Sequence, residues 1–219
     1  MTDSPVIPPH KNKGRPRKFD SNTALKNALG VFWRRGYEPA SISELCTAMG
    51  INPPSLYAAF GNKAQLFMDA VNYYEATYWD ATWDQMTEAS DVHESVRGFF
   101  HEAAHILSSQ DAPCGCLVIL AATNISADAE EVNAALKAMR DDGKHRLIAR
   151  VERAIADGQL SEHTSAGGLG LTLNTLLEGM SLAARDGASR EDLETVAASA
   201  LRLLPTTTSP CEADSSRSK

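Results

Sequence analysis

The sequence has 219 residues, of which 43% are apolar and 22% charged, and this composition is typical of a folded globular chain. No apolar run approaches the roughly 20 residues that cross a bilayer, and the opening residues MTDSPVIPPHKNKGRPRK lack the apolar segment of a secretory signal. These features exclude an integral membrane protein, and the 4 cysteines are too few for a disulfide framework, so we expect a cytoplasmic location.

The net charge of −7 is unevenly distributed along the chain. Residues 1–65 contain nine Lys and Arg against four acidic residues, a net +5, which leaves −12 for the remainder. A basic N-terminal part followed by an acidic remainder indicates that residues 1–65 bind a polyanion. Residues 1–17, rich in proline and basic residues, are predicted to be a flexible arm, and the Ser/Thr/Pro-rich residues 205–219 a disordered tail.

Apolar residues between these two segments recur with a helical period and show no strand-like alternation, which predicts an all-α fold. A first helix is expected over 21–35, with Gly36 as its stop. A second opens at Ser41, a third follows the cap Asn52, and a fourth begins after Asn62.

The second and third helices flank a short Met-Gly-Ile-Asn turn, the arrangement of a helix-turn-helix. In such a pair the second helix enters the major groove of DNA while the first crosses the backbone. The helix over 21–35 would hold the pair rigid. The sequence therefore predicts a three-helix DNA-binding head.

The rest of the chain reads as a larger helical body. Helices are expected over 92–108, over 114–123, from Ser126 to about Ala156, over 166–184 and over 190–204.

The segment Phe32-Trp-Arg-Arg-Gly-Tyr37, followed by Ser41-Ile-Ser-Glu-Leu45, Ala48-Met-Gly-Ile51 and Ser55-Leu-Tyr-Ala-Ala-Phe-Gly-Asn-Lys-Ala-Gln-Leu66, closely resembles the TetR/AcrR family of transcriptional regulators. The resemblance implies a homodimer in which each subunit presents one recognition helix, about Pro53–Phe60, to half of a palindromic operator. It also implies a repressor that a small-molecule effector releases from DNA. The division expected is a basic arm (1–17), a helix-turn-helix domain (18–66), a ligand-binding and dimerisation domain (67–204) and a tail (205–219).

Residue chemistry suggests which side chains face DNA. Ser41 lies at a helix N-terminus, where hydroxyl and free N–H groups bind phosphate, and the Lys63 ammonium and Tyr57 hydroxyl can reach the backbone. The prolines that lead the recognition helix offer apolar contact, for instance with thymine methyl groups. Ala59 departs from the family pattern, which often has His or Tyr there. The expected DNA-binding residues are Arg15, Arg17, Lys18, Ser41, Asn52, Pro53, Pro54, Ser55, Tyr57 and Lys63.

The motif Gly14-Arg-Pro-Arg17 within the arm resembles an AT-hook core. Arginines on an extended chain fit the narrow minor groove of A·T-rich DNA. A basic tail that only aids solubility is the alternative.

The body is expected to supply the ligand pocket and the dimer contacts. The leucines of the last two helices give more apolar surface than the core of one thin body can bury, which favours a four-helix dimer interface. The alternative is that these apolar faces close the core of the monomer. Aromatic area with a few polar groups is typical of small-molecule sites. The lining candidates are Trp83, Phe100, Cys116, Leu120, Asn124, Asn174 and Glu178.

Two alternatives involve other chemistry. His101-Glu-Ala-Ala-His105 matches the H-E-x-x-H motif of zinc hydrolases, but helical geometry turns both histidines away from the apolar face. A metal- or redox-responsive regulator using His101 and His105, or Cys114 and Cys116, stays open, with the Cys114 thiol activated near a helix start. No P-loop, dinucleotide or nucleophile-elbow motif is present in the sequence, so we expect no enzyme, no cofactor and no resident metal.

Overall fold

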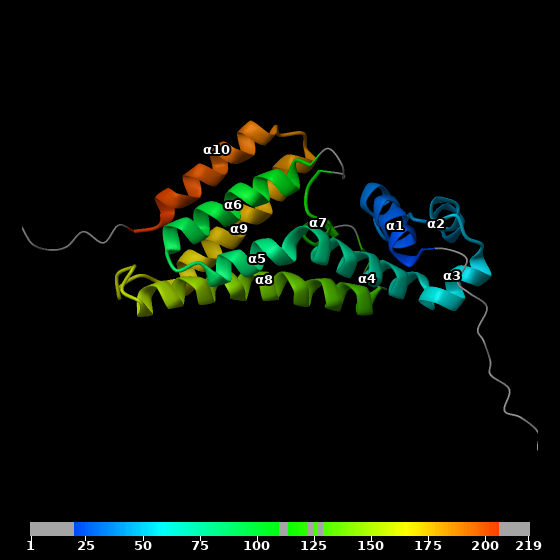
Figure 1. The fold of residues 1–219 in the computed structure, drawn as a ribbon, viewed down its shortest axis with the longest axis horizontal. Helices are drawn as coiled ribbons and strands as arrows, with labels where there is room; N and C mark the ends of the chain where they lie inside the picture. Colours follow the sequence, from blue (N-terminus) through cyan, green and yellow to red (C-terminus); the bar gives the residue numbers. More distant parts are fainter. Residues whose placement is uncertain (1–19, 110–113, 122–124, 127–128, 206–219) are drawn as a thin grey trace, which may run out of the picture.

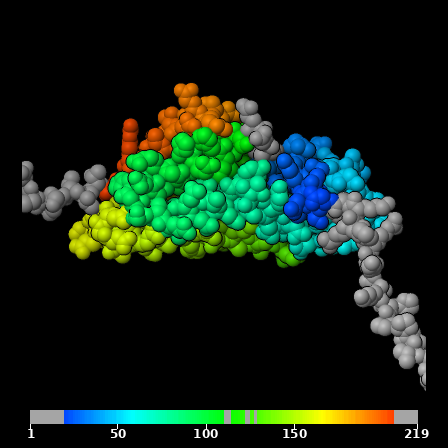
Figure 2. Space-filling model, in the orientation of Figure 1, coloured from blue at the N-terminus to red at the C-terminus, as the bar shows by residue number. Residues whose placement is uncertain are grey.

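A computed structural model describes residues 20–109, 114–121, 125–126 and 129–205. The predicted arm and tail lie outside these residues. The described part is helical without strands, which confirms the all-α prediction. Figure 1 shows an elongated molecule with α1, α2 and α3 gathered at one end and α10 toward the other. Figure 2 shows the first three helices as a blue-to-cyan lobe, here called the head, beside the larger body.

The head consists of α1 (Ser21–Arg35), α2 (Ile42–Met49) and α3 (Pro53–Phe60), which matches the predicted segments. Each helix has a side-chain cap, and the caps of α2 and α3 are the predicted Ser41 and Asn52. α1 ends at the predicted Gly36, α2 at Gly50 and α3 at Gly61, and all three glycines have positive φ, at 85°, 68° and 80°, a region in which a side chain is strained. Glycine at each of these positions therefore fixes where the helix ends.

The fourth helix links the head to the body. It begins as α4 (Lys63–Tyr74), capped by Asn62, widens into the π-helical turn η1 (Glu75–Trp79) and continues as α5 (Asp80–Glu88). The sequence predicted the start of this helix but not its wide turn. Single π turns inside α-helices occur frequently at functional sites.

The body adds α6 (Val92–Leu107), α7 (Leu117–Leu120), α8 (Glu130–Ala156), α9 (Ala166–Arg185), α10 (Arg190–Ala200) and a 3₁₀ turn, η3 (Leu201–Leu203). The most extensive packing is of α8 on α9 and of α10 on α6. At Gly170 the two backbones of the first pair approach so closely that a Cβ would lie 2.7 Å from the Ile148 Cα. Gly170 thus permits close packing of α8 on α9 within one subunit.

Two predicted helix starts were wrong. The helix expected from Cys114 begins only at Leu117, because Gly115 has φ 89°, which a right-handed helix cannot contain. That glycine is required by space as well, since a Cβ there would lie 2.8 Å from the Ser181 carbonyl oxygen. The helix expected from Ser126 begins at Glu130.

Aromatic side chains join the head to α4. The Phe32 and Phe67 rings meet edge to face at 4.9 Å between centroids, and Trp33 meets Tyr74 in the same way at 4.7 Å. Such pairs stabilise by about 0.5–1.5 kcal/mol beyond their buried area. The head is therefore packed rigidly on the first turns of the linking helix. Within the described residues, no helix is long and apolar enough to span a bilayer.

Candidate nucleic-acid interface and body cavity

The recognition helix α3 presents a small, largely uncharged outer face. Leu56 and Phe60 are buried in the head, whereas Pro53 and Pro54 are exposed and the Tyr57 side chain is 49% exposed. Asn52 holds the start of the helix by accepting a hydrogen bond from the Ser55 N–H at 2.9 Å. The candidate residues at 52–55 and 57 thus lie together on one accessible end of α3.

Ser41 caps α2 and is exposed beside this surface. Its Oγ accepts a hydrogen bond from the Glu44 N–H at 3.1 Å, and the hydroxyl hydrogen stays available for a phosphate oxygen. The Glu44 carboxylate accepts a hydrogen bond from Arg35 Nε at 3.1 Å.

Lys63 begins α4 at the edge of the head. Its ammonium donates a hydrogen bond to the Glu38 carbonyl oxygen at 2.9 Å and lies 4.7 Å from the centre of the Tyr37 ring. Partial burial lowers the pKa of this ammonium, partly offset by the Glu38 carboxylate. The candidates Arg15, Arg17 and Lys18 lie outside the described residues.

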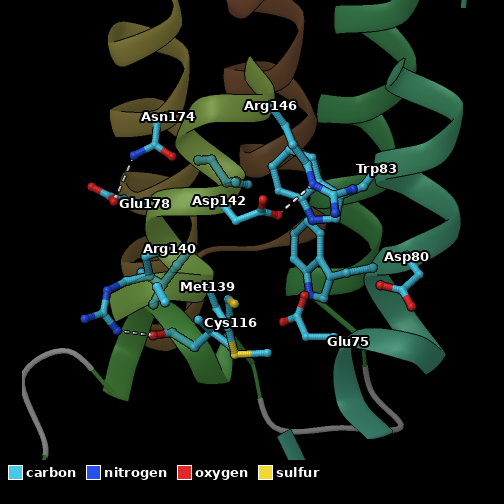
Figure 3. Close-up of a pocket in the computed structure, with 16 residues that line it drawn as sticks. Glu75, Asp80, Trp83, Cys116, Met139, Arg140, Asp142, Arg146, Asn174 and Glu178 are labelled. Atoms are coloured by element: carbon cyan, nitrogen blue, oxygen red, sulfur yellow. Dashed lines mark hydrogen bonds and ion pairs between the residues drawn. The ribbon is translucent and has the colours of Figure 1, made fainter. Parts of the chain in front are cut away.

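A cavity of about 340 Å³ lies inside the body (Figure 3). Trp79 and Trp83 supply its aromatic wall from η1 and α5, and α8 faces them across the space. Further walls come from α7 and α9. The sixteen lining residues are Glu75, Trp79, Asp80, Trp83, Cys116, Val118, Ile119, Ala138, Met139, Arg140, Asp142, Gly143, Arg146, Asn174, Leu177 and Glu178.

The polar groups of α8 and α9 around the cavity are already paired. Arg146 Nε donates to the Asp142 carboxylate at 2.7 Å, and Asn174 donates to Glu178 at 2.9 Å. Arg140 donates to the Val118 carbonyl oxygen at 3.0 Å and so holds α7 against α8.

Two carboxylates differ from these: that of Glu75 in the wide turn and that of Asp80 at the start of α5. Neither carboxylate forms a hydrogen bond or ion pair with another described residue, although the positive charge of Arg146 attracts that of Glu75 at longer range. Burial, and then repulsion by Asp80, raises the pKa of Glu75 to about 7. Burial likewise raises the pKa of the Cys116 thiol to about 12, so this cysteine is a thiol at neutral pH.

The structure places the seven lining candidates in several environments. Trp83, Cys116, Asn174 and Glu178 line the cavity. Phe100 lies in the core instead, fully buried on α6, a helix that contributes nothing to this lining. Leu120 lines a different cavity, described next, and Asn124 lies outside the described residues.

A second cavity of about 460 Å³ lies where the head meets the body. It is bordered by Phe32 and Tyr37 on one side and by Leu120 and Ile125 on the other.

The last two helices carry an apolar groove on their outer side. It has a volume of about 570 Å³ and includes Leu171, Leu176 and Leu203. Two leucines of α9, Leu173 and Leu177, are buried within the subunit and close the monomer core, the alternative expected for the apolar faces of the last two helices.

The alternative chemistries have limited support. Cys114 is exposed but lies three residues before the first residue of α7, so it lacks the helix-start position that the sequence predicted for it. Neither His101 nor His105 lines the body cavity, and their rings lie on the outer side of α6. The enclosed site that a zinc hydrolase requires is not formed around them.

Two family models match the chain. The model described as "Bacterial regulatory proteins, tetR family" matches residues 24–70, and the one described as "Tetracyclin repressor-like, C-terminal domain" matches residues 93–200.

Curated relatives and solved structures agree with these matches. The chain is 34% identical to the HTH-type transcriptional repressor ComR of Escherichia coli K12, over 89% of this chain and 93% of that protein. It is 30% identical to the repressor BdcR of the same strain, over 85% and 90%. A structure of the TetR family transcriptional regulator CifR with 26-bp double-strand operator DNA shares 41% identity, with a TM-score of 0.82 over 87% of this chain and all of that one.

Proposed function

The chain belongs to the TetR family of bacterial regulatory proteins, and we propose that it represses transcription as a homodimer whose two recognition helices bind an operator until a small molecule enters the body. Family membership assigns it to the DNA-binding transcriptional regulators rather than to the enzymes. The observation that carries the proposal is the exposed face of α3 at the far end of the head. The 34%-identical relative is named as a repressor.

We assign DNA binding to residues 18–66 and ligand binding and dimerisation to residues 67–204. In this assignment Pro53, Pro54 and Ser55 enter the major groove. Ser41, Tyr57 and Lys63 bind phosphate, and Asn52 positions the start of α3. Because α3 has no charged residue, direct readout by it depends on apolar contacts and on one hydroxyl. Affinity then depends on phosphate contacts and on the basic arm, with Arg15, Arg17 and Lys18 near the minor groove.

The dimer would form through the groove on α9 and α10. Leu171 lines this groove and is 50% exposed; Leu182, which is 56% exposed and borders the cavity between head and body, lies about three turns further on the same face of α9. Exposed leucines along one face of a helix favour packing of that face against a helix of a second subunit. A second copy of this pair completes a four-helix interface.

The body cavity is the proposed effector site. Aromatic walls beside the two unpaired carboxylates of η1 and α5 favour a ligand with an apolar ring and a hydrogen-bond donor or cationic group. Because Trp79 and Trp83 line the cavity, their fluorescence reports ligand binding directly. Among small aromatic amines, compounds that bind should quench this fluorescence, and each compound that quenches it should release operator DNA. Compounds that quench without releasing DNA would contradict the effector assignment.

Selection of bound DNA from a random pool tests the main proposal. The purified full chain should enrich a palindrome with two half-sites. A matched selection with Tyr57→Ala should give the same half-site at lower affinity, because Tyr57 is assigned to phosphate and not to a base. Failure of the full chain to enrich any sequence would overturn the proposal.

A further inference from the structure

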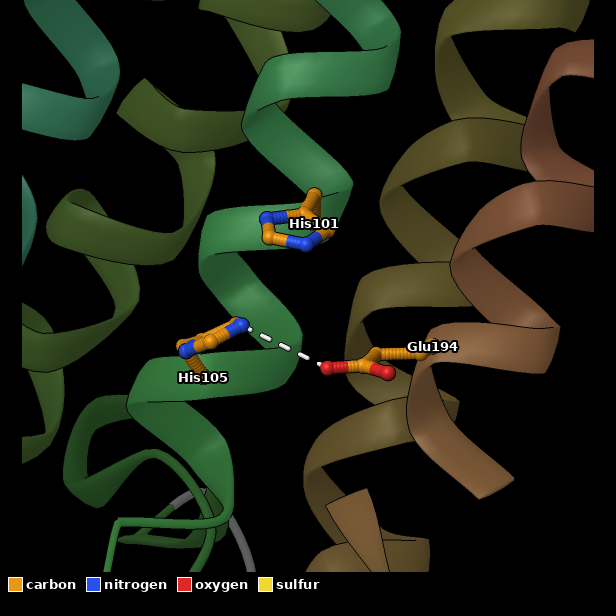
Figure 4. A group of neighbouring side chains, drawn as sticks. All are labelled: His101, His105 and Glu194. Atoms are coloured by element: carbon orange, nitrogen blue, oxygen red, sulfur yellow. Dashed lines mark ion pairs between the residues drawn. The ribbon is translucent and has the colours of Figure 1, made fainter. Parts of the chain in front are cut away.

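Three metal-ligating side chains converge outside the proposed DNA surface and the cavity. His101 and His105 lie one turn apart on α6, and Glu194 reaches them from α10 (Figure 4). One ligand atom of each lies within 4.8 Å of the other two. The His105 Nε2 is 3.4 Å from the Glu194 Oε1, and the two imidazole ring centres are 4.7 Å apart.

These separations suit a single small cation. The ligand atoms of a tetrahedral zinc ion with bonds of about 2.0–2.1 Å lie roughly 3.3 Å from one another. His105 and Glu194 already have that separation, so rotation of the exposed His101 side chain completes a three-ligand set. The outer side of the cluster is open to solvent, which leaves a fourth position for water.

We propose that His101, His105 and Glu194 form a binding site for a divalent first-row transition metal such as Zn²⁺ or Ni²⁺. Two imidazoles and one carboxylate are a ligand set that these ions accept readily. The H-E-x-x-H spacing supplies the two histidines. The third ligand comes from a helix nearly 90 residues later, and Glu102 within the motif is not part of the cluster. The site does not depend on the proposed function.

Among the described residues, Arg190 is the cationic side chain in direct contact with the cluster, and its charge affects metal affinity. Its Nη1 lies 3.2 Å from the His105 Nδ1, where a positive charge opposes a bound metal. When His105 binds a metal through Nε2, Nδ1 carries a proton and no longer accepts from the guanidinium. Arg190 Nε already donates to the Ser108 Oγ at 3.2 Å, so the guanidinium has a second anchor.

A bound ion would connect α10 to α6 by coordinate bonds. In the absence of metal, α10 is connected to α6 at this point by the His105–Glu194 contact and by the contacts of Arg190 with His105 and Ser108. Because metal binds only the folded arrangement of the two helices, it should stabilise the native state. The stabilisation should be absent when any of the three ligands is removed.

Calorimetric titration of the chelator-treated, reduced full chain with ZnCl₂ and NiCl₂ tests the proposal. One ion per subunit is expected, together with a rise in thermal midpoint. His101→Ala and Glu194→Gln should each weaken binding at least ten-fold, whereas His163→Ala, which removes an exposed histidine elsewhere, should not. Arg190→Gln should tighten binding.

Two controls decide the outcome. Cys114→Ser tests whether the exposed thiol holds the ion instead. Because the altered side chains are at the surface, circular dichroism and the metal-free thermal midpoint should match those of the unmodified chain. Full affinity retained in His101→Ala and Glu194→Gln, or affinity lost in Cys114→Ser alone, overturns the proposal.

Discussion

The Lys63 ammonium donates a hydrogen bond of 2.9 Å to the carbonyl oxygen of Glu38, which ties the first residue of α4 to the loop between α1 and α2. The carboxylate of the same Glu38 accepts a hydrogen bond from the Ser126 hydroxyl at 2.8 Å. One loop residue therefore contacts both the start of α4 and the segment before α8. A displacement of the body at Ser126 would be felt at the Lys63 ammonium through this one residue.

Lys63→Ala should weaken operator and non-operator binding by a similar factor. Removal of one phosphate contact reduces the slope of log affinity against log salt by about one and carries no sequence information. Fluorescence anisotropy across a salt series measures both quantities, with Lys63→Arg as the control that keeps the charge. A change in sequence preference would show that the phosphate assignment is wrong.

Removal of residues 1–17 should reduce DNA affinity more than any single substitution in the head. Residues 1–17 contain four Lys and Arg against one acid, whereas residues 18–65 contain five against three. The larger part of the net positive charge of residues 1–65 is thus in the arm, and the loss should be largest at A·T-flanked sites. The double variant Arg15→Ala, Arg17→Ala isolates the minor-groove contribution. Equal affinity of the shortened and full chains would dismiss a role for the arm.

Local sequence signals predicted the head accurately, and the reason is physical. Gly36, Gly50 and Gly61 occupy conformations that other residues resist, and Asn52 and Asn62 satisfy N–H groups within three residues of themselves. Such signals depend only on neighbours in the chain.

The features that sequence reasoning missed depend on distant contacts. The π turn at Glu75 has no local signature, and the carboxylates of Glu75 and Asp80 read in the sequence as ordinary solvated charges. Glu194 became a partner of the histidines only through the packing of α10 on α6. One local signal was missed, Gly115. A glycine at the second position of the helix predicted over 114–123 indicates that the helix begins later in the chain.

Glu75→Gln should make the folded state less sensitive to pH. Because the folded pKa is raised from 4.5 to about 7, the native state keeps a proton that the unfolded chain has lost across this interval. The contribution of Glu75 to the free energy of unfolding is therefore full below about pH 4.5 and is lost as the pH rises to about 7. Thermal midpoints between pH 5 and about pH 8 should show a smaller decline in the variant. Glu88→Gln, an exposed carboxylate on α5, is the matched control and should decline as the unmodified chain does.

Gly170→Ala should destabilise the body by about 1–3 kcal/mol, the range for inserting a methyl group into a packed site. Its Cβ would lie 2.6 Å from the Ile148 Cγ1 and 2.9 Å from that residue's backbone nitrogen, so α8 and α9 must separate. Gly98→Ala on α6 meets nothing within 4 Å and should instead stabilise by about 0.5–1 kcal/mol through helix propensity. Urea unfolding of the two variants measures the difference. Equal urea midpoints for the two variants would show that α8 and α9 separate without loss of stability.

Leu171→Glu should convert the dimer to a monomer at micromolar concentration. Burial of a carboxylate in the α9–α10 groove leaves it unpaired in apolar surroundings, while the subunit keeps its internal core. Sedimentation gives the mass, and operator affinity should fall because one head cannot hold two half-sites. Ala149→Glu on the exposed side of α8 should leave the dimer intact. If Leu171→Glu is still a dimer at micromolar concentration, the dimer interface does not lie in the α9–α10 groove.

The wide turn between α4 and α5 has a mechanical consequence. Conversion of one π turn to a regular turn shifts the hydrogen-bond register by one residue, which corresponds to about 1.5 Å of travel and about 100° of rotation along the axis. Trp79 lies at the end of that turn and on the cavity wall, while the opposite end of the same continuous helix carries Lys63. A molecule that binds against the Trp79 indole and changes this winding would turn Lys63 and the head relative to the body.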